Sequence, residues 1–195
     1  EFRGLPESKL KGKTFLCLGD YERELFTSEA SSGITAKEVL DSYESATLSD
    51  MGSPKAWRAW AQANSSLAHL GEPCTCKNHR HAIEAIGALF KAIENSRTVQ
   101  FQDILKVLML FFKYGHNPNA EAAFRSSMGT IKSSDWLLAL PQLIARMYSS
   151  TSSSCVVVRD LLCKIGADHP QALLYPISVA AKSELHERQS IAQYI

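Results

Sequence analysis

Two cysteines and two histidines lie close together in the chain, at Cys74, Cys76, His79 and His81. Thiolates and imidazoles are zinc ligands, so this cluster is a candidate metal site. Its spacing differs from that of zinc fingers, in which two ligand pairs are set further apart and bracket a folded unit. We therefore interpret residues 71–80 as a solvated linker between two helices, with metal binding as the alternative.

Two tryptophans and two histidines have residue types suited to binding or catalysis. Trp57 and Trp60 could form a stacking platform for bases or cations. They are three residues apart on the apolar face of an expected helix, which favours packing in the core. His116 and His169 stand beside prolines at expected helix boundaries, where we expect them to bond to the backbone.

The remaining thiols and hydroxyls offer weaker signals. Five cysteines are an odd number, too few for a disulfide scaffold in a chain of this length. Cys17, Cys155 and Cys163 occupy positions where a small hydrophobic residue would serve. The serine-rich stretch 149–154 fits a phosphorylated loop and a flexible connector equally well.

The motifs of common active sites are missing from the sequence. It has no glycine-rich phosphate loop of the G-x-G-x-x-G or G-x-x-x-x-G-K-[ST] type and no G-x-S-x-G elbow. The pair His186-Glu187 begins a possible H-E-x-x-H zinc motif, but Arg-Gln-Ser follows it. We therefore predict no catalytic, cofactor-binding or metal-binding residue in this chain.

Composition excludes several classes of protein. The chain has 195 residues, of which 45% are hydrophobic, and 21 basic against 20 acidic side chains give a net charge of +1. Such a chain can bury a core, and it lacks the positive charge with which proteins neutralise nucleic-acid phosphates. Its longest apolar run, 107–112, falls far short of the roughly 20 residues that cross a bilayer. We expect a piece of a longer intracellular protein.

Apolar residues recur at spacings of three and four throughout, which predicts helices and no strands. Gly19 and Gly166 are expected to end helices, and Thr35 with Glu38 forms an expected capping box. Pro141 is expected to kink a helix. The expected helices span 9–18, 21–26, 36–48, 54–70, 81–94, 101–114, 118–128, 136–148, 156–165 and 170–182, with a last one from about residue 184.

Helix 101–114 has the most apolar sequence. We expect Asp103, Lys106 and Lys113 to form its one narrow polar stripe, with neighbouring elements covering most of its sides. Pro176 is expected to kink helix 170–182. Helices of this length joined by short loops predict an all-α protein, an α-solenoid of antiparallel helix pairs.

Three runs in the second half of the chain resemble a known family. They are VQFQDILKVLMLFFKYGHNPNAEAAF, DWLLALPQLIARM and DLLCKIGADHPQALLYPISVAAKS. They follow one another at the spacing found in the FAT domain of the target-of-rapamycin (TOR) kinases, within the phosphatidylinositol-3-kinase-related kinases. Upstream, KTFLCLGDYERELF and SPKAWRAWAQAN resemble the helical repeats that precede them in this family.

The resemblance implies a domain layout. Residues 1–70 would be TPR-like repeats of the FAT domain, 71–80 a linker, and 81–195 its HEAT-like C-terminal part. The family's kinase domain would follow beyond Ile195, and with it the sites for ATP and magnesium. No catalytic residue carries over to this chain.

The resemblance also implies a function. The chain would be a non-catalytic scaffold segment of a TOR-like serine/threonine kinase, wrapping and supporting the kinase domain in nutrient and growth signalling. Its partners would be that kinase domain and other TOR-complex subunits, with no nucleic acid, no direct membrane insertion and no small-molecule substrate. Its location would be the cytoplasm, with endomembranes (lysosome or vacuole) or the nucleus reached through the parent complex. The alternative is a free-standing helical-repeat adaptor that binds a protein partner.

Overall fold

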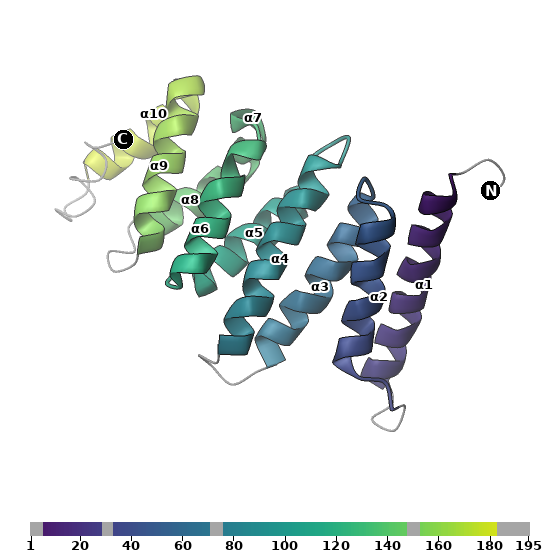
Figure 1. Ribbon diagram of the computed structural model, residues 1–195. Helices are drawn as coiled ribbons and strands as arrows, with labels where there is room; N and C mark the ends of the chain where they lie inside the picture. The colour runs from purple at the N-terminus through teal and green to yellow at the C-terminus, as the bar shows by residue number, and fades with distance from the viewer. Residues whose placement is uncertain (1–5, 29–32, 71–75, 148–152, 183–195) are drawn as a thin grey trace. The chain divides into compact units, whose positions relative to one another are not determined.

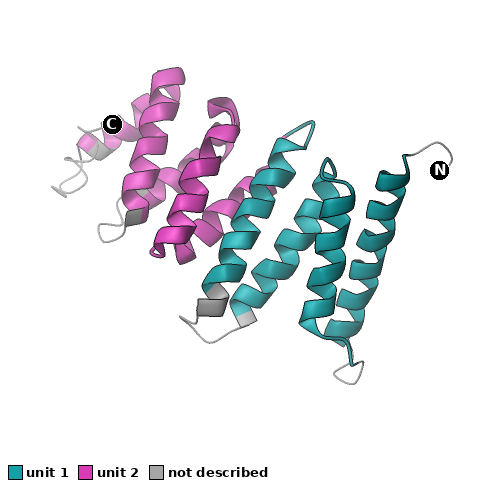
Figure 2. Ribbon diagram, in the orientation of Figure 1, with its two compact units in different colours: residues 1–98 teal, residues 99–195 magenta. Residues whose placement is uncertain are grey.

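The computed structural model describes residues 6–28, 33–70, 76–147 and 153–182 of the chain. Every regular element within these ranges is a helix (Figure 1), so the all-α prediction is confirmed. The chain divides into two compact units, residues 1–98 and 99–195 (Figure 2).

Unit 1 is a run of helices in which each one packs against the next along the chain. Successive helices point in opposite directions (Figure 1), as the prediction of antiparallel pairs requires. The helices are α1 (Glu7–Ser28), α2 (Ala36–Ser49), α3 (Pro54–Leu70) and α4 (Cys76–Glu94). A core cluster of Val39, Tyr43 and Ala63 joins the first three, with Leu16 and Trp60 packed against it.

The start of α2 confirms the predicted capping box. The Glu38 backbone N–H donates to the Thr35 hydroxyl at 3.3 Å, and the Thr35 backbone N–H donates to the Glu38 carboxylate at 2.7 Å. The two bonds satisfy amides that have no partner inside the helix. The same bond from the Thr35 amide lowers the pKa of Glu38, because it favours the charged carboxylate.

One continuous helix replaces the two that were expected before residue 27. Gly19 does not end a helix; it is a buried residue in the middle of α1. A Cβ atom at this position would lie 2.8 Å from the ring of Tyr43, which is closer than real contacts allow. Gly19 is therefore a site of close helix approach, and the prediction of a helix end there was wrong.

We expect Gly19→Ala to lower the free energy of unfolding by about 1 kcal/mol or more. The gain of about 1 kcal/mol in helix propensity is outweighed by crowding of the Tyr43 ring, since overpacking costs about 1–3 kcal/mol. Gly87→Ala in α4 is the matched control, because nothing lies within 4 Å of its added Cβ. That variant should gain roughly 0.5–1 kcal/mol. Chemical denaturation of both variants tests the pair, and stabilisation by Gly19→Ala would contradict the close packing.

The α4 helix begins earlier than expected. It runs from Cys76, so the last five residues of the segment interpreted as a linker, 76–80, are helical. Thr75, a residue type favoured at N-caps, directly precedes Cys76, so the sequence did carry a local signal for this start. Residues 71–75 lie outside the described part of the chain.

In unit 2, α5 has buried residues along its whole length, from Asp103 to Tyr114. The Phe124 ring of α6 stacks on the Phe111 ring, with ring centroids 4.1 Å apart. The Trp136 ring is tilted relative to that of Phe124, and their centroids are 6.2 Å apart. The elements are α5 (Phe101–Tyr114), α6 (Pro118–Ser127), η1 (Met128–Thr130), α7 (Ser133–Trp136), η2 (Leu137–Ala139), α8 (Leu140–Met147), α9 (Ser153–Asp168) and α10 (Pro170–Ala181).

The polar stripe expected on α5 is only partly correct. Lys106 and Lys113 are exposed, but Asp103 is 2% exposed and belongs to the buried face. On the other side of the helix Met109 is 51% exposed although its side chain is apolar. Residue type alone misassigned both positions, because the neighbours of a helix decide which side is covered.

The helix expected over 136–148 is divided into α7, the 3-10 turn η2 and α8. Pro141 is the second residue of α8, not an interior residue of a longer helix. A proline ring clashes with the carbonyl four residues earlier and has no N–H to donate. The turn before Pro141 is therefore a 3-10 turn, and the α-helix does not continue through it. The proline thus separates two short helices, which corrects the expected kink.

Near the C-terminal end of unit 2, α9 continues through Gly166 to Asp168, so Gly166 is not the expected helix end. A Cβ at Gly166 would lie 2.9 Å from Leu173 of α10, which makes this glycine another point of close helix packing. Pro176 lies inside α10 as expected. The helix expected from residue 184 falls outside the described residues.

Candidate functional site

The candidate metal cluster is only partly within the described chain. Cys74 lies outside it, and Cys76 is the first residue of α4, where no side chain is described. His79 and His81 both lie on α4. Among the described side chains, no three His, Cys, Asp or Glu residues gather closely enough to hold a metal ion.

His81 contacts α3 instead. Its Nδ1 lies 2.8 Å from the side-chain oxygen of Asn64, and the Asn64 amide donates in turn to the Trp60 carbonyl at 3.1 Å. Since that oxygen only accepts, the His81 Nδ1–H is the donor in this geometry. Asn64 is 2% exposed. The histidine therefore joins α3 to α4 through a buried amide.

Burial favours the neutral imidazole. Desolvation lowers the pKa of His81 below its ordinary value of 6.5, the charge of Arg80 lowers it further, and Glu84 opposes this in part. The stabilisation by the neutral ring is complete above the ordinary pKa and is lost as the pH falls toward the lowered folded value.

We expect acidification to destabilise the chain less when residue 81 cannot titrate. His81→Gln keeps a polar side chain and removes the ionisable ring, so the drop in melting temperature between about pH 7.5 and pH 5 should be smaller than in the unmodified chain. Thermal melts at both pH values measure the difference. An unchanged pH dependence would contradict the assignment.

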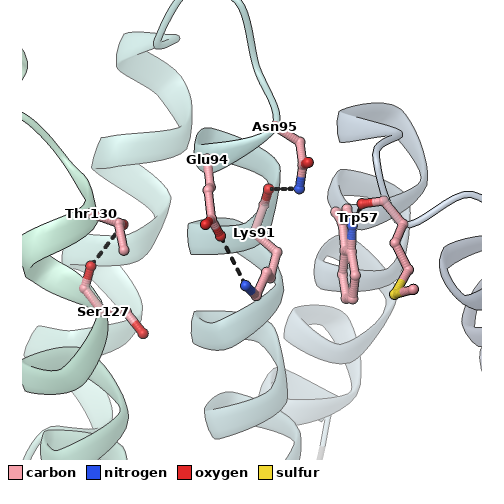
Figure 3. A network of polar contacts seen from close by, with 7 residues as sticks. Trp57, Lys91, Glu94, Asn95, Ser127 and Thr130 are labelled. Carbon is pink, nitrogen blue, oxygen red and sulfur yellow. Dashed lines mark hydrogen bonds and ion pairs between the residues drawn. The ribbon is translucent and has the colours of Figure 1, made fainter.

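The two tryptophans serve the packing of α3. Trp60 is packed against the Val39 cluster, and its ring centroid lies 5.9 Å from that of Trp57. The Trp57 Nε1–H donates to the carbonyl oxygen of Met51 at 2.8 Å (Figure 3), which holds the turn between α2 and α3. Trp60 is thus partly buried against the core, whereas Trp57 is partly buried and closes a turn, so the core interpretation fits Trp60 better than Trp57.

The other candidates differ in their surroundings. The backbone N–H of His169 donates to the Ile165 carbonyl at the end of α9, while His116 is an exposed residue after α5. Cys17 is exposed and Cys155 is buried. Burial raises the pKa of the Cys163 thiol, so its thiolate fraction at neutral pH is reduced. Most of the serine-rich stretch, 149–152, lies outside the described residues.

The polar side chains form hydrogen bonds between helices, which we call ties. The Tyr43 hydroxyl of α2 donates to the Asp20 carboxylate of α1 at 2.8 Å, and burial together with this carboxylate raises the pKa of Tyr43. Arg58 of α3 donates to the Ser96 hydroxyl after α4 at 2.7 Å. Each tie joins two elements that are neighbours in unit 1.

Unit 2 has ties of the same kind. Arg125 of α6 donates to Glu121 one turn earlier at 2.8 Å and to Asp160 of α9 at 2.9 Å. These two carboxylates raise the pKa of Arg125. The Ser133 hydroxyl of α7 donates to Asp168, also on α9. The α9 helix thus receives polar contacts from two preceding helices.

Local hydrogen bonds and an ion pair lie at the ends of helices. Figure 3 shows the Lys91 ammonium 2.9 Å from the Glu94 carboxylate and the Asn95 amide donating to the Lys91 carbonyl at the end of α4. In unit 2 the Thr130 hydroxyl donates to the Ser127 carbonyl at 2.8 Å, as drawn in the same figure. Lys91 and Glu94 are exposed, so this pair contributes about 0.5 kcal/mol at most.

Sequence reasoning missed the ties between helices. Neither Asp20 nor Asp160 was expected to bond to another helix. The partners Arg125 and Asp160 are 35 residues apart, and no local spacing marks such a pair. Only the Glu121–Arg125 pair, at a spacing of four, could have been found from the sequence.

Comparison with known proteins gives two family matches. Residues 6–109 match the FAT domain family, and residues 121–195 match the HEAT repeats of the ATR-like serine/threonine-protein kinases. The first match ends within α5 and the second begins within α6, so both boundaries fall in unit 2. No helix in the described ranges is long and apolar enough to cross a membrane.

The similar proteins are large kinases. The serine/threonine-protein kinase TOR of Oryza sativa is 32% identical over 98% of this chain, and tor1 of Schizosaccharomyces pombe is 31% identical over 97%. TOR2 of Saccharomyces cerevisiae is 40% identical over 58% of it. The chain spans about 8% of the length of the first two and 5% of the third. The chain belongs to the FAT domain family, and the proteins it resembles along its length are TOR serine/threonine kinases.

Proposed function

We propose that this chain is a non-catalytic scaffold segment of a TOR-like serine/threonine kinase. In this role it wraps and supports the kinase domain and contributes to the assembly of the kinase complex in nutrient and growth signalling. The kinase domain itself would lie in another part of a longer protein. ATP and magnesium would bind there, and this chain would hold no cofactor.

The observation that carries the proposal is the use of polar side chains to join helices. Tyr43, Asn64 and Arg125 each reach from one helix to a carboxylate or ring on another. Helical repeats gain stability from contacts between neighbouring repeats, and such contacts transmit a change of angle from one repeat to the next. A support for a kinase domain needs this kind of rigidity.

Further parts of the proposal concern layout and location. We assign residues 1–70 to TPR-like repeats, 71–80 to the linker and 81–195 to the HEAT-like part. The partners would be the protein's own kinase domain and other subunits of a TOR complex. The location would be the cytoplasm, with endomembranes or the nucleus reached through that complex.

We expect loss of the unit 2 core to lower kinase activity in the full-length protein. Leu108→Asp changes a buried residue of α5 and leaves every residue of the kinase domain unchanged. Val156→Asp is the control, because it adds the same charge at an exposed position of α9. Purified full-length proteins would be compared for phosphorylation of a substrate peptide and for complex size by gel filtration.

The expected result is a clear loss of activity or of complex assembly for Leu108→Asp and little change for Val156→Asp. Full activity in a Leu108→Asp protein whose unit 2 is shown to be unfolded would refute the scaffold role. Phosphate transfer from ATP by the purified 195-residue chain alone would refute its non-catalytic nature.

A further inference from the structure

An open groove of about 480 Å³ lies between α5 and α8 in unit 2. Its size is within the roughly 300–1,000 Å³ of pockets that take up ligands or several side chains of a bound peptide. Its walls come from one face of α5 and from Gln142 and Arg146 of α8. All of these residues belong to the same compact unit.

The floor of the groove is apolar. Leu105, Met109 and Phe112 follow one another along α5 at intervals of four and three residues, and Leu108 lies beneath them. Met109 is half exposed. Methionine adapts its shape to different partners, and residues at this spacing form a stripe that matches the apolar stripe of a second helix.

The groove is also positively charged. Lys113 and Arg146 are exposed residues on its wall, and no lining residue is acidic. Arg146 lies with its guanidinium carbon 5.1 Å from the centroid of the Phe112 ring, which places the charge directly beside the apolar floor. Lys106 is also exposed, and it lies about one helical turn before Met109 and two turns before Lys113 on α5.

The two helices hold one acidic residue between them, and it does not line the groove. Asp103 is the single acidic residue of α5, and at about 100° per residue it lies on the opposite side of the helix from Phe112. The α8 sequence, LPQLIARM, contains no acidic residue. An apolar floor with cations beside it complements a partner that is apolar on one side and acidic at its flanks.

We propose that the α5–α8 groove binds an acidic amphipathic helix of a partner protein. Leucine-like side chains of that helix would lie on Leu105, Met109 and Phe112. Its Asp or Glu residues would pair with Lys113 and Arg146. The proposal is independent of the scaffold role, because it concerns one surface of unit 2 and does not require a kinase domain.

The test uses two fluorescein-labelled peptides of about 15 residues, long enough for several helical turns. Both carry leucines at helical spacings of three and four; the flanking residues are glutamates in one and lysines in the other. Fluorescence anisotropy measures their binding to the 195-residue chain at low and high salt. We expect the glutamate peptide to bind roughly tenfold more tightly or better, with an affinity that falls as salt rises.

Charge reversal locates the site. The double variant Lys113→Glu with Arg146→Glu should lose the glutamate peptide and gain affinity for the lysine peptide, while Lys164→Glu, an exposed change on α9, should leave both unchanged. Met109→Gln should weaken binding of the glutamate peptide through the loss of an apolar contact. Circular dichroism and thermal melts verify that each variant is folded.

Equal binding of the two peptides, or an unchanged affinity in the double variant, would overturn the proposal. Self-association of the chain that the double variant abolishes would also overturn it, because a second copy of the chain would then be the occupant of the groove.

Discussion

The variant Leu108→Asp is expected to unfold much of unit 2. Leu108 is 1% exposed in the middle of α5, so the aspartate would place a carboxylate where water cannot reach it. The loss of a buried leucine and the burial of an unpaired charge together cost about 4 kcal/mol or more. That is a large share of the roughly 5–15 kcal/mol that stabilises a typical domain.

Thermal melting followed by circular dichroism measures the loss, and amide hydrogen exchange locates it. Exchange should rise in α5, α6 and α9, which pack together, while the helices of unit 1 stay protected. Met109→Asp is the matched control at the next residue of the same helix, where the side chain is half exposed. It should change stability by no more than about 0.5 kcal/mol. A melting temperature of Leu108→Asp equal to that of the unmodified chain would show that α5 is not central to the unit.

A second large effect is expected at Tyr43 in unit 1. Its side chain is 0% exposed, its ring fills the space left by Gly19, and its hydroxyl donates to Asp20. Removal of a buried aromatic ring leaves a cavity, so Tyr43→Ala should cost about 3–5 kcal/mol in the free energy of unfolding. Chemical denaturation with urea gives this value directly.

Tyr43→Phe separates the ring from the hydroxyl. It keeps the packing against Gly19 and removes only the hydrogen bond to Asp20, whose half-exposed carboxylate can bind water instead. We expect a loss of about 1 kcal/mol. Tyr21→Ala on the exposed side of α1 should have almost no effect, since Tyr21 is 62% exposed. Equal losses for Tyr43→Ala and Tyr43→Phe would show that the hydroxyl, and not the ring, holds α1 to α2.

Several features could be predicted from the sequence because they depend on neighbours along the chain. The capping box of Thr35 and Glu38 involves residues three apart, and the Asn117 cap before Pro118 involves residues two and three apart. The start of α3 after Ser53 follows a similar local rule. The runs that resemble the TOR family are also local patterns, and the family matches confirm them.

Glycine positions could not be interpreted from the sequence alone. A glycine can end a helix, or it can lie inside a helix where a neighbouring side chain occupies the place of its Cβ. Gly19 and Gly166 are of the second kind, against Tyr43 and Leu173. The residues next to a glycine do not mark which of the two applies, so the tertiary structure is needed to decide it.

By itself, the sequence determined the helical class, most helix boundaries and the family, because helix propensity, capping and apolar spacing act over a few residues. Tertiary structure decided that Asp103 is buried, that His81 contacts Asn64, and that Arg125 reaches Asp160 on another helix. It also decided that the cations of α5 and α8 flank one apolar groove. These features arise where helices distant in sequence meet, and the energy of such a contact depends on distance and burial, which no local pattern records.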